Sequence, residues 1–138
     1  MVETRLAPWG ALALRLALGT MWVSHGLLKL LVYTPAGFVA YLQSVGLPTQ
    51  VAVPVILAEL VGGAAILAGF HGRWASLALS PILVGATLAH APNGWVFSSP
   101  NGGWEFPVFL IAASAAHALL GDGRLAFRAW RPLAAQPA

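Results

Sequence analysis

The sequence predicts an all-α integral membrane protein, a four-helix bundle formed by a single domain that covers residues 1–138. Three observations lead to this prediction. Hydrophobic residues make up 59% of the chain and charged residues only 8%, whereas a soluble domain carries about 25% charged residues. Four long apolar stretches alternate with short connections, and none shows the polar–apolar alternation of a strand. Such a chain cannot cover a water-facing surface, so we expect it to face lipid.

Each apolar stretch is close to the length of about 20 residues that crosses a bilayer. The predicted spans are residues 9–32, 51–70, 74–91 and 104–120. We expect a loop rich in Pro, Gly and aromatic residues at 33–48 and a second loop, rich in turn-forming residues, at 92–103. The helices are apolar almost all round, which disfavours a soluble bundle, because its helices would show polar outer faces.

The distribution of basic residues predicts the orientation. An even number of spans places both termini on one side, and most basic residues lie there: Arg5, Arg73, Arg124, Arg128 and Arg131. The two loops on the other side contain no Lys or Arg, and only Lys29 flanks them. The positive-inside rule therefore predicts that both termini are cytoplasmic.

Composition also excludes several classes of chemistry. The chain has no cysteine, which rules out disulfides, CxxC redox pairs, covalent c-type haem and cysteine-ligated iron–sulfur or zinc sites. The basic residues are few and scattered, so nucleic acid is not an expected partner. No phosphate-binding or dinucleotide-binding glycine motif is present. Any redox chemistry must therefore use a bound cofactor or a partner protein.

Polar residues inside the predicted spans are functional candidates, because a charge at the centre of a membrane helix costs about 2.5–3.5 kcal/mol. Several gather toward the outer half of the membrane, with one carboxylate nearer the middle. The sequence predicts a ligand-binding polar pocket from this set, which we call the outer polar residues: His25, Lys29, Glu59, His90, Asn93 and Glu105.

Structural explanations also apply to these residues. Lys29 can extend outward to the interface, and the helix dipole favours Glu105 at the start of the fourth span. Arg15 could reach Glu59 from the cytoplasmic half and form a buried pair. His117 lies toward the cytoplasm and is expected to be a packing residue. Small-residue pairs on the second span, such as Ala58 with Gly62, predict close helix contacts.

The outer polar residues allow several ligands. His25 and His90 could ligate a b-type haem from both faces or join Glu105 in a metal site. Nothing in the sequence fixes ligand spacing across helices, so neither haem nor a metal is expected. Neutral histidines, a lysine and carboxylates could instead bind a quinone headgroup and exchange its protons. No residue is assigned a catalytic role.

Five short motifs follow one another along the chain, and their order and spacing are specific. They are His25-Gly26-Leu27-Leu28-Lys29, Glu59-Leu60-Val61-Gly62-Gly63, His90-Ala91-Pro92-Asn93-Gly94, Gly102-Gly103-Trp104-Glu105 and Gly121-Asp122-Gly123-Arg124. In these motifs, and over about residues 11–128, the sequence resembles the DoxX family of small four-helix membrane proteins.

The resemblance implies a multi-pass protein of a bacterial or archaeal plasma membrane that is associated with oxidoreductase systems. The family takes its name from a subunit linked to a terminal quinol oxidase and to thiosulfate:quinone oxidation. The leading hypothesis is a subunit or membrane partner of a quinone-linked oxidoreductase, which need not be an autonomous enzyme. A non-enzymatic scaffold or assembly factor is the second hypothesis and a small-solute transporter the third. Besides lipid and a redox enzyme, a second copy of the chain is a possible partner.

Overall fold

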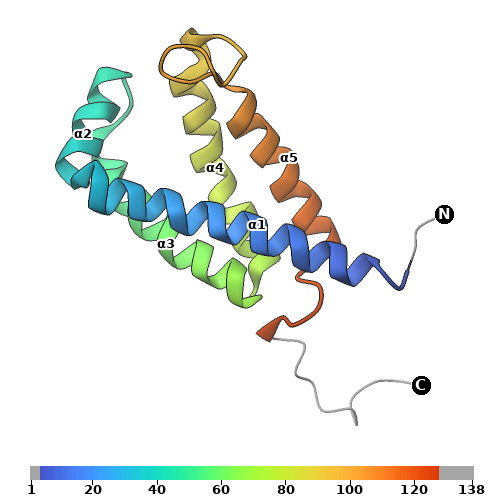
Figure 1. Cartoon of the computed structure of the whole chain (residues 1–138). Helices are drawn as coiled ribbons and strands as arrows, with labels where there is room; N and C mark the ends of the chain where they lie inside the picture. The colour runs from blue at the N-terminus through green and yellow to red at the C-terminus, as the bar shows by residue number, and fades with distance from the viewer. Residues whose placement is uncertain (1–3, 128–138) are drawn as a thin grey trace.

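The computed structural model describes residues 4–127, and this part of the chain is helical without strands. The elements are α1 (Ala7–Leu27), the π-helical turn η1 (Leu28–Val32), α2 (Thr34–Ser44), the 3-10 turn η2 (Thr49–Val51), α3 (Ala52–Ala68), α4 (Gly72–His90), the 3-10 turn η3 (Ala91–Asn93) and α5 (Glu105–Leu120). In Figure 1, α1 and α3 run side by side, and α4 and α5 form a second pair that diverges from them.

Three helical stretches are long and apolar enough to cross a membrane: Ala7–Val32, Thr49–Ala68 and Gly72–Asn93. They correspond to the first three predicted spans. The fourth, α5, is apolar but has only 16 residues, which makes it about 24 Å long against a hydrocarbon core of about 30 Å. The chain is therefore a membrane protein with three candidate spans, and the fourth span stays a prediction.

The segment predicted as a loop at 33–48 contains the helix α2, so the loop prediction is wrong there. Proline and glycine suggested a loop, but Pro35 lies in the first turn of the helix, where its missing N–H costs nothing. Phe38 and Leu42 lie one turn apart and are both buried. They pack with Ala52 and Ile56 in a small core of their own, so tertiary packing stabilises the helix.

Glycines let α1 and α3 pack closely. A Cβ atom at Gly19 of α1 would lie 2.6 Å from the Leu67 side chain, and one at Gly63 of α3 would lie 2.9 Å from Val23. Gly62 likewise allows α3 to pack closely on α4, because a Cβ atom at Gly62 would lie 2.7 Å from the Leu79 side chain. The small residues of α3 therefore serve contacts within the bundle, in line with the predicted close approach.

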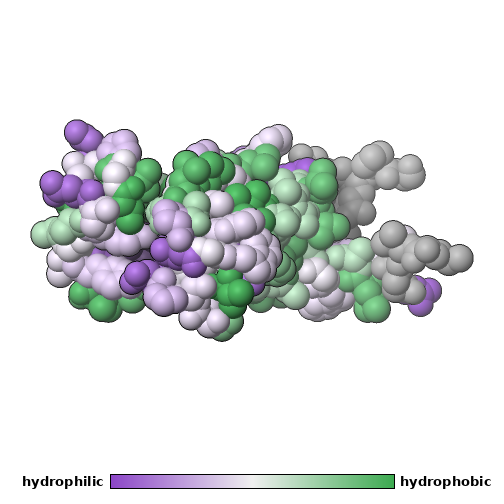
Figure 2. Space-filling view, turned by 90° about the horizontal axis from the view of Figure 1, so that it is seen from above, coloured by the Kyte–Doolittle hydropathy of each residue, from purple (hydrophilic) through white to green (hydrophobic). Residues whose placement is uncertain are grey.

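The central core is apolar and lies where the two helix pairs meet. Its buried side chains come from α1, α3, α4 and α5: Leu18, Trp22, Ile66, Leu79, Leu83 and Leu110. Large apolar side chains also cover the outside, among them Leu31, Val61 and Leu119, which are 69%, 69% and 83% exposed. Exposed apolar surface on this scale suits contact with lipid. Figure 2 shows apolar surface mixed with polar patches on the face seen from above.

The molecule has two ends, which we call the outer end and the inner end and define by the segments that lie there. The outer end carries α2 and the 94–104 loop, and the inner end carries the first turn of α1, the 69–71 turn and residues 121–127. The Arg124 amide donates to the Pro8 carbonyl over 3.2 Å, so both described chain ends meet at the inner end. The cytoplasmic location of this end stays a prediction, and Arg128 and Arg131 lie outside the described residues.

Candidate functional site

Lys29 and Glu59 form an ion pair near the outer end. The Lys29 Nζ atom lies 2.7 Å from Glu59 Oε1 and 2.8 Å from Oε2. The Glu59 side chain is 2% exposed and that of Lys29 is 16% exposed, so the carboxylate is enclosed while the lysine is partly open to the surroundings. Nζ also lies 5.3 Å from the centre of the Phe38 ring. The lysine therefore links α1, α2 and α3 through one charged group.

This pairing corrects one expectation. Arg15 does not reach Glu59; its guanidinium donates instead to backbone carbonyls at the inner end. Lys29 lies on the π-helical turn η1, which continues α1. Such turns often occur at functional sites and hold one extra residue per turn, which changes the direction of the side chains that follow. Nothing in the run Leu27–Val32, which is apolar apart from Lys29, marks a π turn, so the sequence did not indicate it.

His25 lies one turn before Lys29 and contacts α5. Its Nδ1–H donates to the Met21 carbonyl over 2.9 Å. Because a carbonyl only accepts, this bond fixes the tautomer in which Nε2 is the acceptor nitrogen. No other residue of the described chain hydrogen-bonds Nε2. The ring stacks on Phe106, with centroids 6.2 Å apart and planes at 25°.

The remaining three outer polar residues organise the 94–104 loop. Asn93 Nδ2 donates to the carbonyls of Asn101 (3.2 Å) and Gly102 (2.8 Å). Glu105 Oε1 accepts the Phe97 amide over 2.7 Å. His90 donates from Nδ1 to a carbonyl of its own helix, and its ring lies against Gly102. These contacts account for all three side chains as loop supports.

The structure thus divides the outer polar residues into two groups. Lys29 and Glu59 form one group with His25 beside them, and the loop-supporting residues form the other. The stacked pair of His25 and Phe106 joins the groups, because Phe106 follows Glu105 at the start of α5. Their role in binding a ligand stays a prediction.

A hollow of about 470 Å³ opens next to this junction. Its lining is largely aromatic and apolar, with one carboxylate: Trp95, Phe97, Glu105, Phe106, Val108, Phe109 and Ala112. Phe106 and Phe109 are 45% and 67% exposed, so the hollow is open on the outer surface of α5. An aromatic wall with a single acidic group suits a flat, weakly polar ring.

A second polar group lies at the inner end, and we call it the inner network: Arg15, Ser76, His117 and Asp122. Asp122 accepts the amides of Gly72 (3.2 Å) and Arg73 (2.8 Å), the first two residues of α4. It therefore caps a helix from a distant point in the chain. The sequence offered one signal, the Gly121-Asp122-Gly123 run, which indicated only the end of the fourth span.

The other members enclose this cap. The His117 Nδ1 and Ser76 Oγ atoms lie 2.7 Å apart, and His117 Nε2 lies 3.4 Å from Asp122 Oδ1. Arg15 donates to the Asp122 carbonyl over 2.8 Å. Arg15, Ser76 and His117 are all at most 2% exposed. Within residues 4–127, no group of three His, Cys, Asp or Glu side chains could hold a metal ion.

Comparison with known proteins gives one match. The model of the DoxX family matches residues 10–92, more than half of the chain; no curated protein and no solved structure matches it. The matched region contains the first two motifs and the first three residues of the third, His90–Pro92. The motifs at 102–105 and 121–124 lie beyond it. The resemblance seen in the sequence is confirmed: this membrane protein belongs to the DoxX family.

Proposed function

We propose that this protein is a membrane partner of a quinone-linked oxidoreductase and that it holds a quinone headgroup at its outer end. The observation that carries the proposal is the position of His25. Its ring has a free Nε2 acceptor and stacks on Phe106, which also lines the aromatic hollow with Glu105. Family membership supports the association with redox enzymes.

The hollow offers what a quinone headgroup needs. The ring can stack on aromatic side chains, each pair being worth about 0.5–1.5 kcal/mol beyond buried area. His25 Nε2 can accept a hydrogen bond from the hydroxyl of the reduced, quinol form. The hollow opens on the apolar outside of α5, from which a lipid-soluble ligand can enter. Quinone reduction takes two electrons and two protons, and the partner enzyme supplies the electrons.

The ion pair of Lys29 and Glu59 has a separate part in this proposal. Both carboxylate oxygens are bonded to Nζ, so the pair is locally neutral and shields the ligand from an isolated buried charge. It fixes the end of α1 that presents His25, because Lys29 also contacts Phe38 of α2. We therefore regard Lys29 and Glu59 as positioning residues and His25 as the ligand contact.

Two other functions have weaker support. The small-residue faces that favoured a scaffold are occupied inside the bundle, Gly62 by Leu79 and Gly63 by Val23. A transporter would need a water-filled path from Glu105 through Glu59 to His117, and a buried apolar core from α1, α3, α4 and α5 fills the place where the two helix pairs meet. Neither function gains a specific observation from the described residues.

Binding of a short-chain quinol to the full chain in lipid nanodiscs tests the proposal, with quenching of tryptophan fluorescence as the signal because Trp95 lines the hollow. We expect saturable quenching in the unaltered protein and affinity lower by about fivefold to tenfold in His25→Ala, from the loss of one hydrogen bond and a stacked ring. His71→Asn is the matched control, since His71 lies in the turn at the inner end. Equal affinity in all three proteins, or no saturable quenching, would contradict it.

A further inference from the structure

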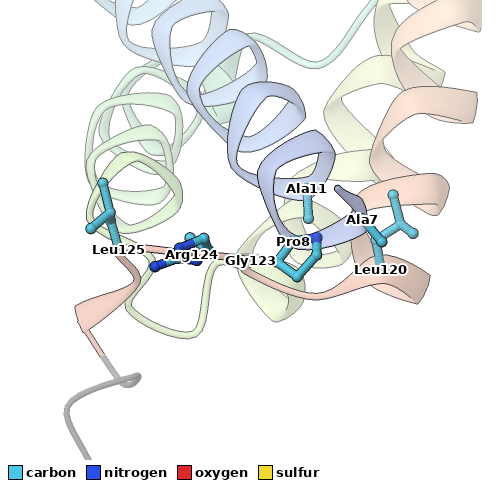
Figure 3. A pocket seen from close by; sticks show the side chains of 7 residues that line it. All are labelled: Ala7, Pro8, Ala11, Leu120, Gly123, Arg124 and Leu125. Carbon is cyan, nitrogen blue, oxygen red and sulfur yellow. The ribbon is translucent and has the colours of Figure 1, made fainter. Parts of the chain in front are cut away.

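A second hollow, of about 500 Å³, lies at the inner end. Its walls are the first turns of α1 and the segment that follows α5: Ala7, Pro8, Ala11, Leu120, Gly123, Arg124 and Leu125. Figure 3 shows this segment leaving the end of α5 at Leu120 and passing beneath the first turn of α1. Arg124 is the charged residue of the lining, and the other side chains are apolar.

The segment is fixed in place by several bonds. The Arg124 amide donates to the Pro8 carbonyl. The buried guanidinium of Arg15 donates to the Asp122 and Leu125 carbonyls over 2.8 Å and 3.3 Å. Both walls of the hollow are therefore anchored to the bundle, and its shape belongs to the folded protein.

The Arg124 side chain, which lines this hollow, also lies beside Trp9. Its guanidinium carbon lies 4.6 Å from the centre of the Trp9 ring, and Arg124 and Trp9 are both exposed. Tryptophan and arginine at the end of a membrane helix mark the level of the lipid headgroups. A cation next to an apolar hollow at this level matches the two parts of a phospholipid, whose phosphate would lie at the cation and whose acyl chain would contact the apolar lining.

We propose that this hollow binds one anionic phospholipid, with its phosphate on Arg124 and an acyl chain against Ala7, Ala11 and Leu120. Charge selects this occupant over the chain's own C-terminal segment, which carries Arg128 and Arg131 and so has the same sign as Arg124. The proposal rests on observations separate from the quinone site.

Native mass spectrometry of the full chain with equal amounts of phosphatidylglycerol and phosphatidylcholine, matched in their acyl chains, tests this site. We expect one phosphatidylglycerol to be retained in preference, and Arg124→Gln to lower that preference about fivefold. The control is Arg73→Gln: Arg73 lies at the same end, 5.6 Å from the Trp74 ring, and does not line the hollow. If both variants lose the preference for phosphatidylglycerol equally, lipid retention depends only on the overall charge of the protein, and the proposal is overturned.

Two further measurements locate the lipid. Ala7→Leu keeps Arg124 but narrows the hollow, and we expect it to reduce retention while the helical circular dichroism is unchanged. Phosphatidylglycerol with a photoactivatable group in its acyl chain should label the peptides that contain Ala11 and Leu120. Labels confined to other surfaces would overturn the proposal. Displacement of the lipid by free glycerol phosphate would overturn it in favour of a simple phosphate site.

Discussion

The polar groups at the two ends of this bundle contain similar residue types but are enclosed to different degrees. At the inner end, Arg15 and His117 are at most 2% exposed, and their hydrogen bonds join α1, α4, α5 and the segment after α5. At the outer end, the Lys29 side chain is 16% exposed, and His25 stacks on Phe106, which lines an open hollow.

This difference separates support from binding. The inner network uses its charges to hold a helix start and a chain end, as Asp122 does for α4. The outer group holds its carboxylate just as firmly but leaves a neighbouring ring available. Both groups contain charged side chains inside membrane helices, so charge alone does not distinguish a supporting role from a binding role. The exposed fraction of the side chains and the partners of their hydrogen bonds do.

The largest effect that we expect from breaking either group comes from Asp122→Ala. The change removes the acceptor for the Gly72 and Arg73 amides and the carboxylate that lies beside His117. Loss of a cap costs about 1 kcal/mol. Loss of the carboxylate beside the buried His117, 3.4 Å from its Nε2, adds more, so the free energy of unfolding should fall by about 3 kcal/mol.

Thermal unfolding in detergent, followed by circular dichroism, measures this loss. Arg124→Gln is the control, because its exposed side chain lies outside the inner network. If Asp122→Ala unfolds like Arg124→Gln, the inner network does not support the fold as we describe it.

The second prediction concerns Lys29→Met at the outer end. It leaves the Glu59 carboxylate, 2% exposed, without a cation. We expect a loss of about 2 kcal/mol, smaller than for Asp122→Ala because Lys29 makes one ion pair whereas Asp122 also caps α4. The double variant Lys29→Met/Glu59→Gln should recover part of that loss, since the orphaned charge is gone. The same unfolding measurement checks both variants, and strictly additive losses would show that the two side chains are not coupled.

The sequence predicted the helical membrane architecture well, because composition and the length of apolar runs determine it directly. It also predicted that the small residues of α3 make close helix contacts. The helix α2 was missed because local turn signals suggested a loop, and its stability depends on Phe38 and Leu42 packing against the distant residues Ala52 and Ile56. Intrinsic propensity alone does not contain that packing.

The site was predicted less completely, for a related reason. Spacing along each helix brought out His25, Lys29 and Glu59 as candidates, but it does not say which groups pair across helices. The expected partner of Glu59 was Arg15, and the actual partner is Lys29, which lies on a π turn. Asp122 could not be assigned to the start of α4, because the two are 50 positions apart in the sequence.

The smallest effect should come from Asn93→Ala, which sharpens the division between the two outer groups. Its two bonds to the 94–104 loop are partly exposed, so their loss should cost about 0.5–1 kcal/mol. The effect should be local: hydrogen exchange at the Gly102 amide, which is bonded to the Ser99 carbonyl, becomes about threefold to fivefold faster as the loop opens more often. Amides of α1 and α3 should keep their protection, because the ion pair of Lys29 and Glu59 does not touch this loop. Faster exchange around Glu59 would show instead that the two outer groups act as one.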